Sequence, residues 1–292
     1  MNKLAEAWQR RGRYHTVDGF DLFVVDLPPT EVALGPPVVF LHAFPTSSFD
    51  FAGVVDELSR HHRLLLPDLL GFGLSDKPDL PYSLGLQADF VSGLLEDLAV
   101  ERCALVSHDI GNLVGAELLA RHLEGSWPVE VTARVLVNGL VSEDLARPSI
   151  GRQFLLRQPD LRIDEQDAPD RAAVLASVTA TYAPTTAPDP EVLAAQWDFI
   201  SYLDGHRLLH RTVRHVAGSP PAEARLTGAL ARHPSPLTVV WGSDDPLADP
   251  EDVRVLATRL GAVGLALLPG AGRYPMLEAP HRFAQAVSRA LG

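Results

Sequence analysis

The feature that most constrains the fold of this chain is an alternation of short apolar runs with longer segments of helical periodicity. Buried strands that alternate with amphipathic helices are typical of a mostly parallel sheet covered by helices. An N-terminal hairpin is expected from residues 13–17 and 21–27. Further strands are predicted at residues 36–41, 63–66, 102–107, 131–137, 237–241 and 265–268, and helices near 51–60, 86–98, 111–123, 250–260 and 280–291. We therefore expect an α/β fold with a mostly parallel sheet of eight strands.

The alternation is interrupted between residues 141 and 232. No run in this stretch has the pattern of a buried strand, and proline-rich joints such as Ala183-Pro184 separate its amphipathic segments. These segments lie at residues 171–181, 191–203, 207–216 and 222–231. We therefore expect residues 1–140 and 233–292 to form one α/β core, and residues 141–232 to form a helical cap inserted into it.

Composition limits the partners and the location of the protein. The chain has 25 basic and 37 acidic residues and a formal net charge of −12, which argues against nucleic acid or an anionic membrane as a partner. Neither a signal-peptide pattern nor a membrane-spanning run is visible, and the single cysteine, Cys103, lies in an apolar run. We expect a cytoplasmic monomer or homodimer that acts on a small molecule. No cofactor is expected and no metal site, because the adjacent pair His61-His62 rarely converges on one ion.

A turn between a predicted strand and a predicted helix carries the most specific motif. Ser107-His108-Asp109-Ile110-Gly111 has small residues on both sides of a central nucleophile, as a tight strand-to-helix turn requires. The turn would place the Asp109 carboxylate beside a helix N-terminus, where it can attack carbon and form an ester. The alternative is that Asp109 only caps the helix.

Two further loops follow predicted strands. In Leu41-His42-Ala43-Phe44-Pro45, the N–H of Phe44 is expected to join that of Ile110 in an oxyanion hole. The side chain of His42 is more simply a structural part of this loop. In residues 241–246, Asp245 is the best candidate for the acid of a catalytic triad, although such a sequence is also an ordinary turn.

Together with Leu70-Gly71-Phe72-Gly73-Leu74-Ser75-Asp76-Lys77-Pro78, these motifs resemble those of the α/β-hydrolase superfamily. The similarity is to the branch of epoxide hydrolases and haloalkane dehalogenases that use an aspartate nucleophile. Within that branch it points to the group of mesoderm-specific transcript proteins and their bacterial relatives. The resemblance runs from about Arg13 to the C-terminus and is weakest in the predicted cap.

The resemblance implies a role for several side chains. Asp109 would be the nucleophile and Asp245 the triad acid. Relatives use two cap tyrosines to protonate an epoxide oxygen, and the only tyrosines of the predicted cap are Tyr182 and Tyr202, which could equally be packing residues. The side chains expected to contact substrate are His42, His108 and Trp197.

One position departs from the family pattern. Relatives carry the catalytic histidine in Gly-x-Gly-His-x-Pro-x-x-Glu-x-Pro, whereas this chain reads Gly270-Ala271-Gly272-Arg273-Tyr274-Pro275-Met276-Leu277-Glu278-Ala279-Pro280. An arginine keeps its proton and cannot act as a general base. Attack by Asp109 needs no base, but hydrolysis of the ester needs an activated water. Turnover is therefore in doubt.

Three explanations of Arg273 are open. The chain is a trapping variant of a working hydrolase, or an enzyme in which Arg273 binds a substrate carboxylate or an oxyanion, or a binding protein in which Arg273 forms a salt bridge with Asp109 or Asp245. A substitute base is a further alternative, with candidates His206, His210 and His215.

The residue after the nucleophile bears on the substrate. Dehalogenases of this branch have a tryptophan there, and Ile110 has no side-chain donor for a halide. We expect an epoxide hydrolase-like hydrolase in which Asp109 attacks a small apolar substrate. The alternatives are a non-hydrolytic enzyme that uses Arg273 for binding, and a catalytically inactive ligand-binding or interaction protein.

Overall fold

The computed structural model describes residues 1–139, 150–216 and 220–292, and they contain an eight-stranded sheet of order β1-β2-β4-β3-β5-β6-β7-β8. β2 pairs with β1 and β4 in antiparallel fashion, and the remaining neighbours are parallel. This order confirms the predicted α/β fold with its mostly parallel sheet. The strands are β1 (Gly12–Val17), β2 (Phe20–Leu27), β3 (Val38–Leu41), β4 (Leu64–Pro67), β5 (Arg102–His108), β6 (Glu130–Val137), β7 (Leu237–Gly242) and β8 (Gly264–Leu268).

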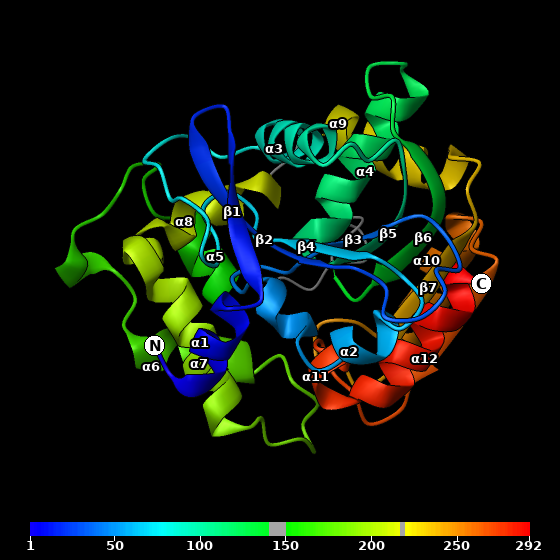
Figure 1. Ribbon diagram of the computed structural model, residues 1–292. Helices are drawn as coiled ribbons and strands as arrows, with labels where there is room; N and C mark the ends of the chain where they lie inside the picture. The colour runs from blue at the N-terminus through cyan, green and yellow to red at the C-terminus, as the bar shows by residue number, and fades with distance from the viewer. Residues whose placement is uncertain (140–149, 217–219) are drawn as a thin grey trace.

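Helices cover both faces of the sheet (Figure 1). Strand side chains alternate between the faces, so that Val38 and Phe40 of β3 pack in one core while Val39 and Leu41 pack in the other. The first core includes α1 (Lys3–Gln9), α2 (Val55–Leu58), α11 (Pro275–Glu278) and α12 (Pro280–Leu291). The second includes α3 (Leu84–Asp97), α4 (Ile110–Leu123), α9 (Pro220–Arg232) and α10 (Pro250–Arg259).

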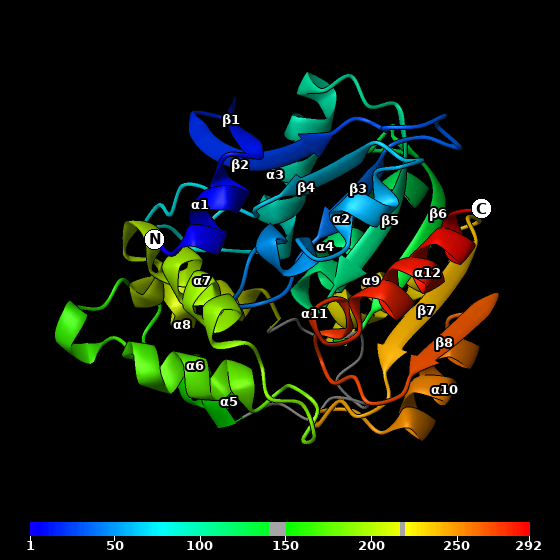
Figure 2. The same cartoon turned by 60° about the horizontal axis from the view of Figure 1, so that its bottom comes forward.

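The described part of the chain between β6 and β7 is helical, as the sequence predicts. It contains α5 (Ile150–Leu156), α6 (Arg171–Thr179), α7 (Pro190–Ser201), α8 (Leu209–Thr212) and α9. Helices α5 to α8 gather beside one end of the sheet, and α7 packs against α1 (Figures 1 and 2). The expected boundary between residues 140 and 141 lies outside the described residues, so the division into core and cap stays a prediction. No described helix has the length and apolarity needed to cross a membrane.

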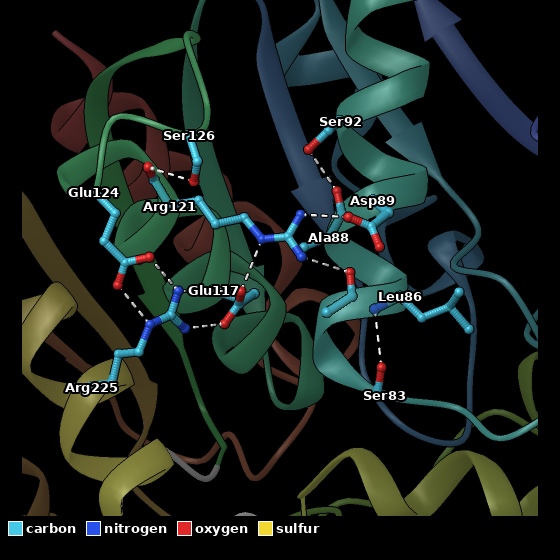
Figure 3. Close-up of polar contacts among 11 residues, drawn as sticks. Ser83, Leu86, Ala88, Asp89, Ser92, Glu117, Arg121, Glu124, Ser126 and Arg225 are labelled. Carbon is cyan, nitrogen blue, oxygen red and sulfur yellow. Dashed lines mark hydrogen bonds and ion pairs between the residues drawn. The ribbon is translucent and has the colours of Figure 1, made fainter.

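A network of ion pairs connects α9 to α4 and α3, two helices of the second core (Figure 3). Arg225 of α9 donates to Glu124 at 2.7 Å and also pairs with Glu117 of α4. Glu117 accepts in turn from Arg121 at 2.9 Å, which reaches Asp89 of α3 at 2.6 Å. Helix α9 is thus attached to α4, whereas the other helices of its segment lie at the end of the sheet.

The structure differs from the predicted elements where helices are short. The helix expected over residues 51–60 is divided into a 3₁₀ turn at Ser48–Phe51 and the single turn α2. Helices α1, α5 and α11 were not predicted, because four to seven residues carry too little periodicity to stand out from a loop. Helix α1 is held by its N-cap, where the Asn2 side chain accepts from the N–H of Ala5 at 2.9 Å.

Candidate active site

Asp109 lies between β5 and α4 in a backbone conformation that non-glycine residues rarely adopt, with φ 54°. Its N–H donates to the carbonyl of Asn138 at 2.8 Å. A Cβ added at Gly139 would lie 2.2 Å from the Asp109 Cα, and one at Gly111 would lie 2.3 Å from the Leu41 carbonyl oxygen. The turn is therefore as tight as the small residues of the motif predict. The Asp109 side chain makes no capping hydrogen bond to α4, which leaves its carboxylate for other contacts.

The Asp109 carboxylate meets a backbone donor and a guanidinium. Its Oδ2 accepts from the N–H of Phe44 at 3.2 Å, and its Oδ1 accepts from Nη2 of Arg273. Ile110 is the first residue of α4, where backbone N–H groups have no partner within the helix. Of the two predicted oxyanion-hole donors, the N–H of Phe44 contacts the carboxylate, and the role of the Ile110 N–H stays a prediction. Burial is the largest single influence and would raise the pKa of Asp109, but the charge and hydrogen bond of Arg273, with His108 and the N–H of Phe44, together hold the pKa below its ordinary value.

Arg273 bridges Asp109 to Asp245, the predicted triad acid. Its Nη1 lies 3.3 Å from Oδ2 of Asp245, an oxygen that also accepts from Nδ2 of Asn138 at 2.8 Å. Burial lowers the pKa of Arg273, but the two carboxylates raise it above its ordinary value, so the side chain stays charged. Of the three explanations of Arg273, the third predicts these salt bridges.

The loop that carries Arg273 is fixed by the carboxylate of Glu278. Its two oxygens accept from the N–H groups of Gly272 at 2.9 Å, Tyr274 at 3.1 Å and Ala183 at 2.8 Å. The N–H of Arg273 donates to the carbonyl of Thr181 at 3.0 Å. Glu278 therefore fastens the loop to the segment after α6 and explains why the motif needs an acid at this position.

The two predicted histidines bind the backbone. Nδ1 of His42 donates to the Ala43 carbonyl at 2.9 Å, and its Nε2 accepts from the N–H of Leu69 at 2.9 Å. Nε2 of His108 donates to the Arg273 carbonyl at 2.9 Å. Burial lowers the pKa of His108 to about 4, so its ring is neutral near pH 7. Both contacts favour the structural interpretation given above for His42 and extend it to His108.

The two tyrosines predicted as proton donors and the tryptophan predicted to contact substrate each have different neighbours. The ring of Tyr182 stacks on that of Tyr274 at 5.2 Å, and its buried hydroxyl has no hydrogen-bond partner. The ring of Tyr202 lies 5.1 Å from Nζ of Lys77. Trp197 packs on the small core of the inserted helices, around Leu155, Ile200, Leu209 and Val213. In the part of the chain that the structure describes, no hydrogen bond joins either tyrosine to Asp109.

Two of the histidines considered as substitute bases have hydrogen-bond partners other than the site residues. Nε2 of His206 lies 3.1 Å from the Glu165 carboxylate, and Nε2 of His210 donates to the Leu161 carbonyl at 2.6 Å. The side chain of His215 lies outside the described residues.

Two residues of the site were missed. Asn138 follows β6 and binds both Asp245 and the N–H of Gly242, the latter at 2.9 Å through its Oδ1. Its place directly after a buried strand was the available signal. Asp50 is fully buried beyond the loop of Phe44 and accepts from Gln196 of α7 at 2.8 Å. Nothing in the local sequence distinguishes it from an ordinary turn residue.

Comparisons with known proteins agree with this architecture. Residues 38–286 match the alpha/beta hydrolase family. The mesoderm-specific transcript protein of Mus musculus is 30% identical over 295 residues, which cover 98% of this chain and 87% of that protein. Haloalkane dehalogenase 1 of Mycobacterium bovis is 30% identical over 241 residues, which cover 78% of this chain and 74% of the dehalogenase.

A solved structure shares the fold. An alpha/beta hydrolase fold protein from Burkholderia ambifaria superposes with a TM-score of 0.79 at 25% sequence identity, and the match covers 94% of this chain and 96% of that one. The similarity to that superfamily, inferred above from short motifs, is thereby confirmed.

Proposed function

This chain belongs to the alpha/beta hydrolase family, and from that premise we propose that it is a hydrolase in which Asp109 attacks a small, largely apolar epoxide. An oxygen of the Asp109 carboxylate forms a bond to a ring carbon while the C–O bond of the epoxide breaks. The alkoxide takes a proton from the hydroxyl of Tyr182, which makes no other hydrogen bond of normal geometry, and Tyr182 then regains a proton from solvent. Tyr202 is the second proton donor, and the inserted helices α5 to α8 form the cap that covers the substrate, whereas α9 packs on α4. The product of this step is an ester of Asp109.

The observation that carries this proposal is the strained turn at Asp109. A non-glycine residue held at φ 54° costs about 1–3 kcal/mol, and such strain concentrates at functional sites. A plain helix cap would not require it, and the side chain caps nothing here. The strained turn leaves the carboxylate beside the N–H of Phe44, and this N–H and that of Ile110 would stabilise the oxyanion formed when water later attacks the ester.

Arg273 limits the second half of the reaction. We take it to occupy the position of the family's base histidine, and its guanidinium cannot accept a proton from water. It also holds Oδ1 of Asp109, so this contact must loosen for attack through that oxygen. We therefore expect ester to form faster than it is hydrolysed.

Intact-mass measurement after incubation with a panel of epoxides tests the proposal. We expect a mass increase equal to one substrate, located on Asp109 by peptide mapping and absent from the Asp109→Asn variant. Arg273→His should convert the accumulated ester into steady release of diol. Diol release that persists in Asp109→Asn would refute the role of Asp109.

A second candidate function is binding of a small apolar molecule without reaction. The observation that favours it is the occupation of both acids, Asp109 and Asp245, by Arg273. This candidate predicts saturable binding of the epoxide, measured by calorimetry, with no adduct and an equal affinity in Asp109→Asn.

A further inference from the structure

Asp50 is a buried carboxyl group without a counter-ion. It lies in the 3₁₀ turn after the Phe44 loop, where its side chain is fully buried. Its Oδ1 accepts from Nε2 of Gln196 at 2.8 Å and its Oδ2 accepts from the hydroxyl of Thr46. Both donors are neutral, and no cation among the described residues pairs with it. A lone buried carboxylate is costly, so the proton is held more tightly than in water.

Two polar atoms beside Asp50 make no hydrogen bond of normal geometry, although their side chains are close enough for Gln196 to lower the pKa of Tyr182. They are the hydroxyl of Tyr182 and Oε1 of Gln196, on side chains that are 4% and 1% exposed. The amide that donates to Asp50 carries this Oε1, so the two groups are adjacent. Buried polar atoms are nearly always hydrogen-bonded, often through an internal water with two to four partners. Asp50, Gln196 and Tyr182 together offer one water a full set of donors and acceptors.

Asp50 is connected to Asp109 through the Phe44 loop. The hydroxyl of Thr46 contacts both Asp50 and, at 3.3 Å, the carbonyl of Ala43, and the N–H of the next residue, Phe44, donates to Asp109 at 3.2 Å. Burial chiefly raises the pKa of Asp50, to about 7, and the charges of Asp68 and Asp109 add to that rise. Asp50 in turn raises the pKa of Tyr182 and of Tyr274, the ring that stacks on Tyr182. Asp109 is shifted the other way, downward, by Arg273. Carboxyl groups with opposite shifts in one site commonly divide the roles of nucleophile and of acid or base.

We propose that Asp50 is the general base for hydrolysis of the Asp109 ester, acting on a water held by Gln196 and Tyr182. This role rests on the function proposed above. The Asp50 carboxylate takes a proton from the water, and the hydroxide oxygen forms a bond to Cγ of Asp109. The tetrahedral oxyanion, stabilised by the N–H groups of Phe44 and Ile110, collapses with cleavage of the ester C–O bond. The leaving alkoxide takes the proton of the new carboxylic acid, and Asp50 returns its proton to solvent.

Single-turnover decay of the ester tests the proposal. The ester is formed with an epoxide, free substrate is removed, and the remaining adduct mass is followed from pH 5 to 9. We expect the decay rate to rise about tenfold per unit below pH 7 and to level off above it. Asp50→Asn should slow decay at least about 100-fold, a change much larger than any that it causes in the rate of ester formation. Asp97→Asn, which removes an exposed carboxylate on α3, should keep the original profile.

Thr46→Val gives a second and milder test that preserves side-chain shape. The Thr46 hydroxyl lowers the pKa of Asp50, so its loss should move the midpoint of the pH profile upward. A normally formed ester that decays at the same rate in Asp50→Asn overturns the role of Asp50 and leaves the proposed function intact. Failure of any ester to form in this protein, together with no release of diol by Arg273→His, overturns the proposed function and the role of Asp50 with it.

Discussion

Replacing Asp50 with asparagine should change the pH dependence of stability by an amount that follows from its burial. The folded protein holds this carboxyl at a pKa of about 7, against an ordinary value of 3.8. The rise of about three units, at 1.36 kcal/mol per unit, corresponds to about 4 kcal/mol. Between these two pKa values the folded state keeps a proton that the unfolded state has lost. Stability contributed by this group therefore falls as the pH rises from about 4 to 7 and is constant above 7.

Urea unfolding of both proteins at pH 5 and pH 8 measures this effect. About two of the three pKa units lie between these pH values. On going from pH 5 to pH 8, the original protein should therefore lose about 3 kcal/mol of unfolding free energy that the Asp50→Asn variant keeps. The Asp97→Asn variant controls for the loss of one charge. A difference between the Asp50→Asn variant and the original protein that stays constant within 1 kcal/mol from pH 5 to pH 8 would refute the buried-carboxyl argument.

Two further changes test the site's construction. Arg273→Met should lower the free energy of unfolding by about 3–5 kcal/mol near pH 8, because Asp109 and Asp245 are left buried without their cation; a loss below 1 kcal/mol in urea unfolding would contradict this. Gly111→Ala should cost about 3 kcal/mol, since its Cβ would meet a backbone carbonyl at 2.3 Å, whereas Gly115→Ala, with its nearest contact at 3.7 Å, should gain about 0.5–1 kcal/mol from helix propensity. Equal melting shifts for these two alanines would argue against the close approach at the turn.

The sequence predicted the parts of the structure that are determined by residues close together in the chain. The eight strands follow from short apolar runs, and the tight turn at Asp109 follows from five consecutive residues. Asp245 and Arg273 could be placed because each follows a strand, and parallel strands bring their carboxyl ends to one edge. The salt bridges of Arg273 with Asp109 and Asp245 were expected under only one of the three explanations of Arg273, since an arginine has several possible partners.

The residues that could not be predicted are those whose partners are distant in the chain. Asp50 and Gln196 are separated by 146 residues, and Asn138 and Asp245 by 107. Their pairing depends on how the inserted helices dock on the loops of the sheet, and no periodicity encodes that docking. Helix α1 was missed for the same reason, because seven residues become a helix only when Trp8 is buried against the first core.

The arginine at position 273 and the carboxyl group at position 50 are best understood together. A histidine between Asp109 and Asp245 would leave Asp109 without a permanent cation, and it would itself alternate between neutral and charged forms. Arg273 fixes that charge and keeps Asp109 ionised, which suits a nucleophile but removes the means of activating water. Any hydrolysis must then use a group whose proton is exchangeable near neutral pH. Among the described carboxyl groups coupled to Asp109, Asp50 has that property, because burial without a counter-ion opposes its ionisation.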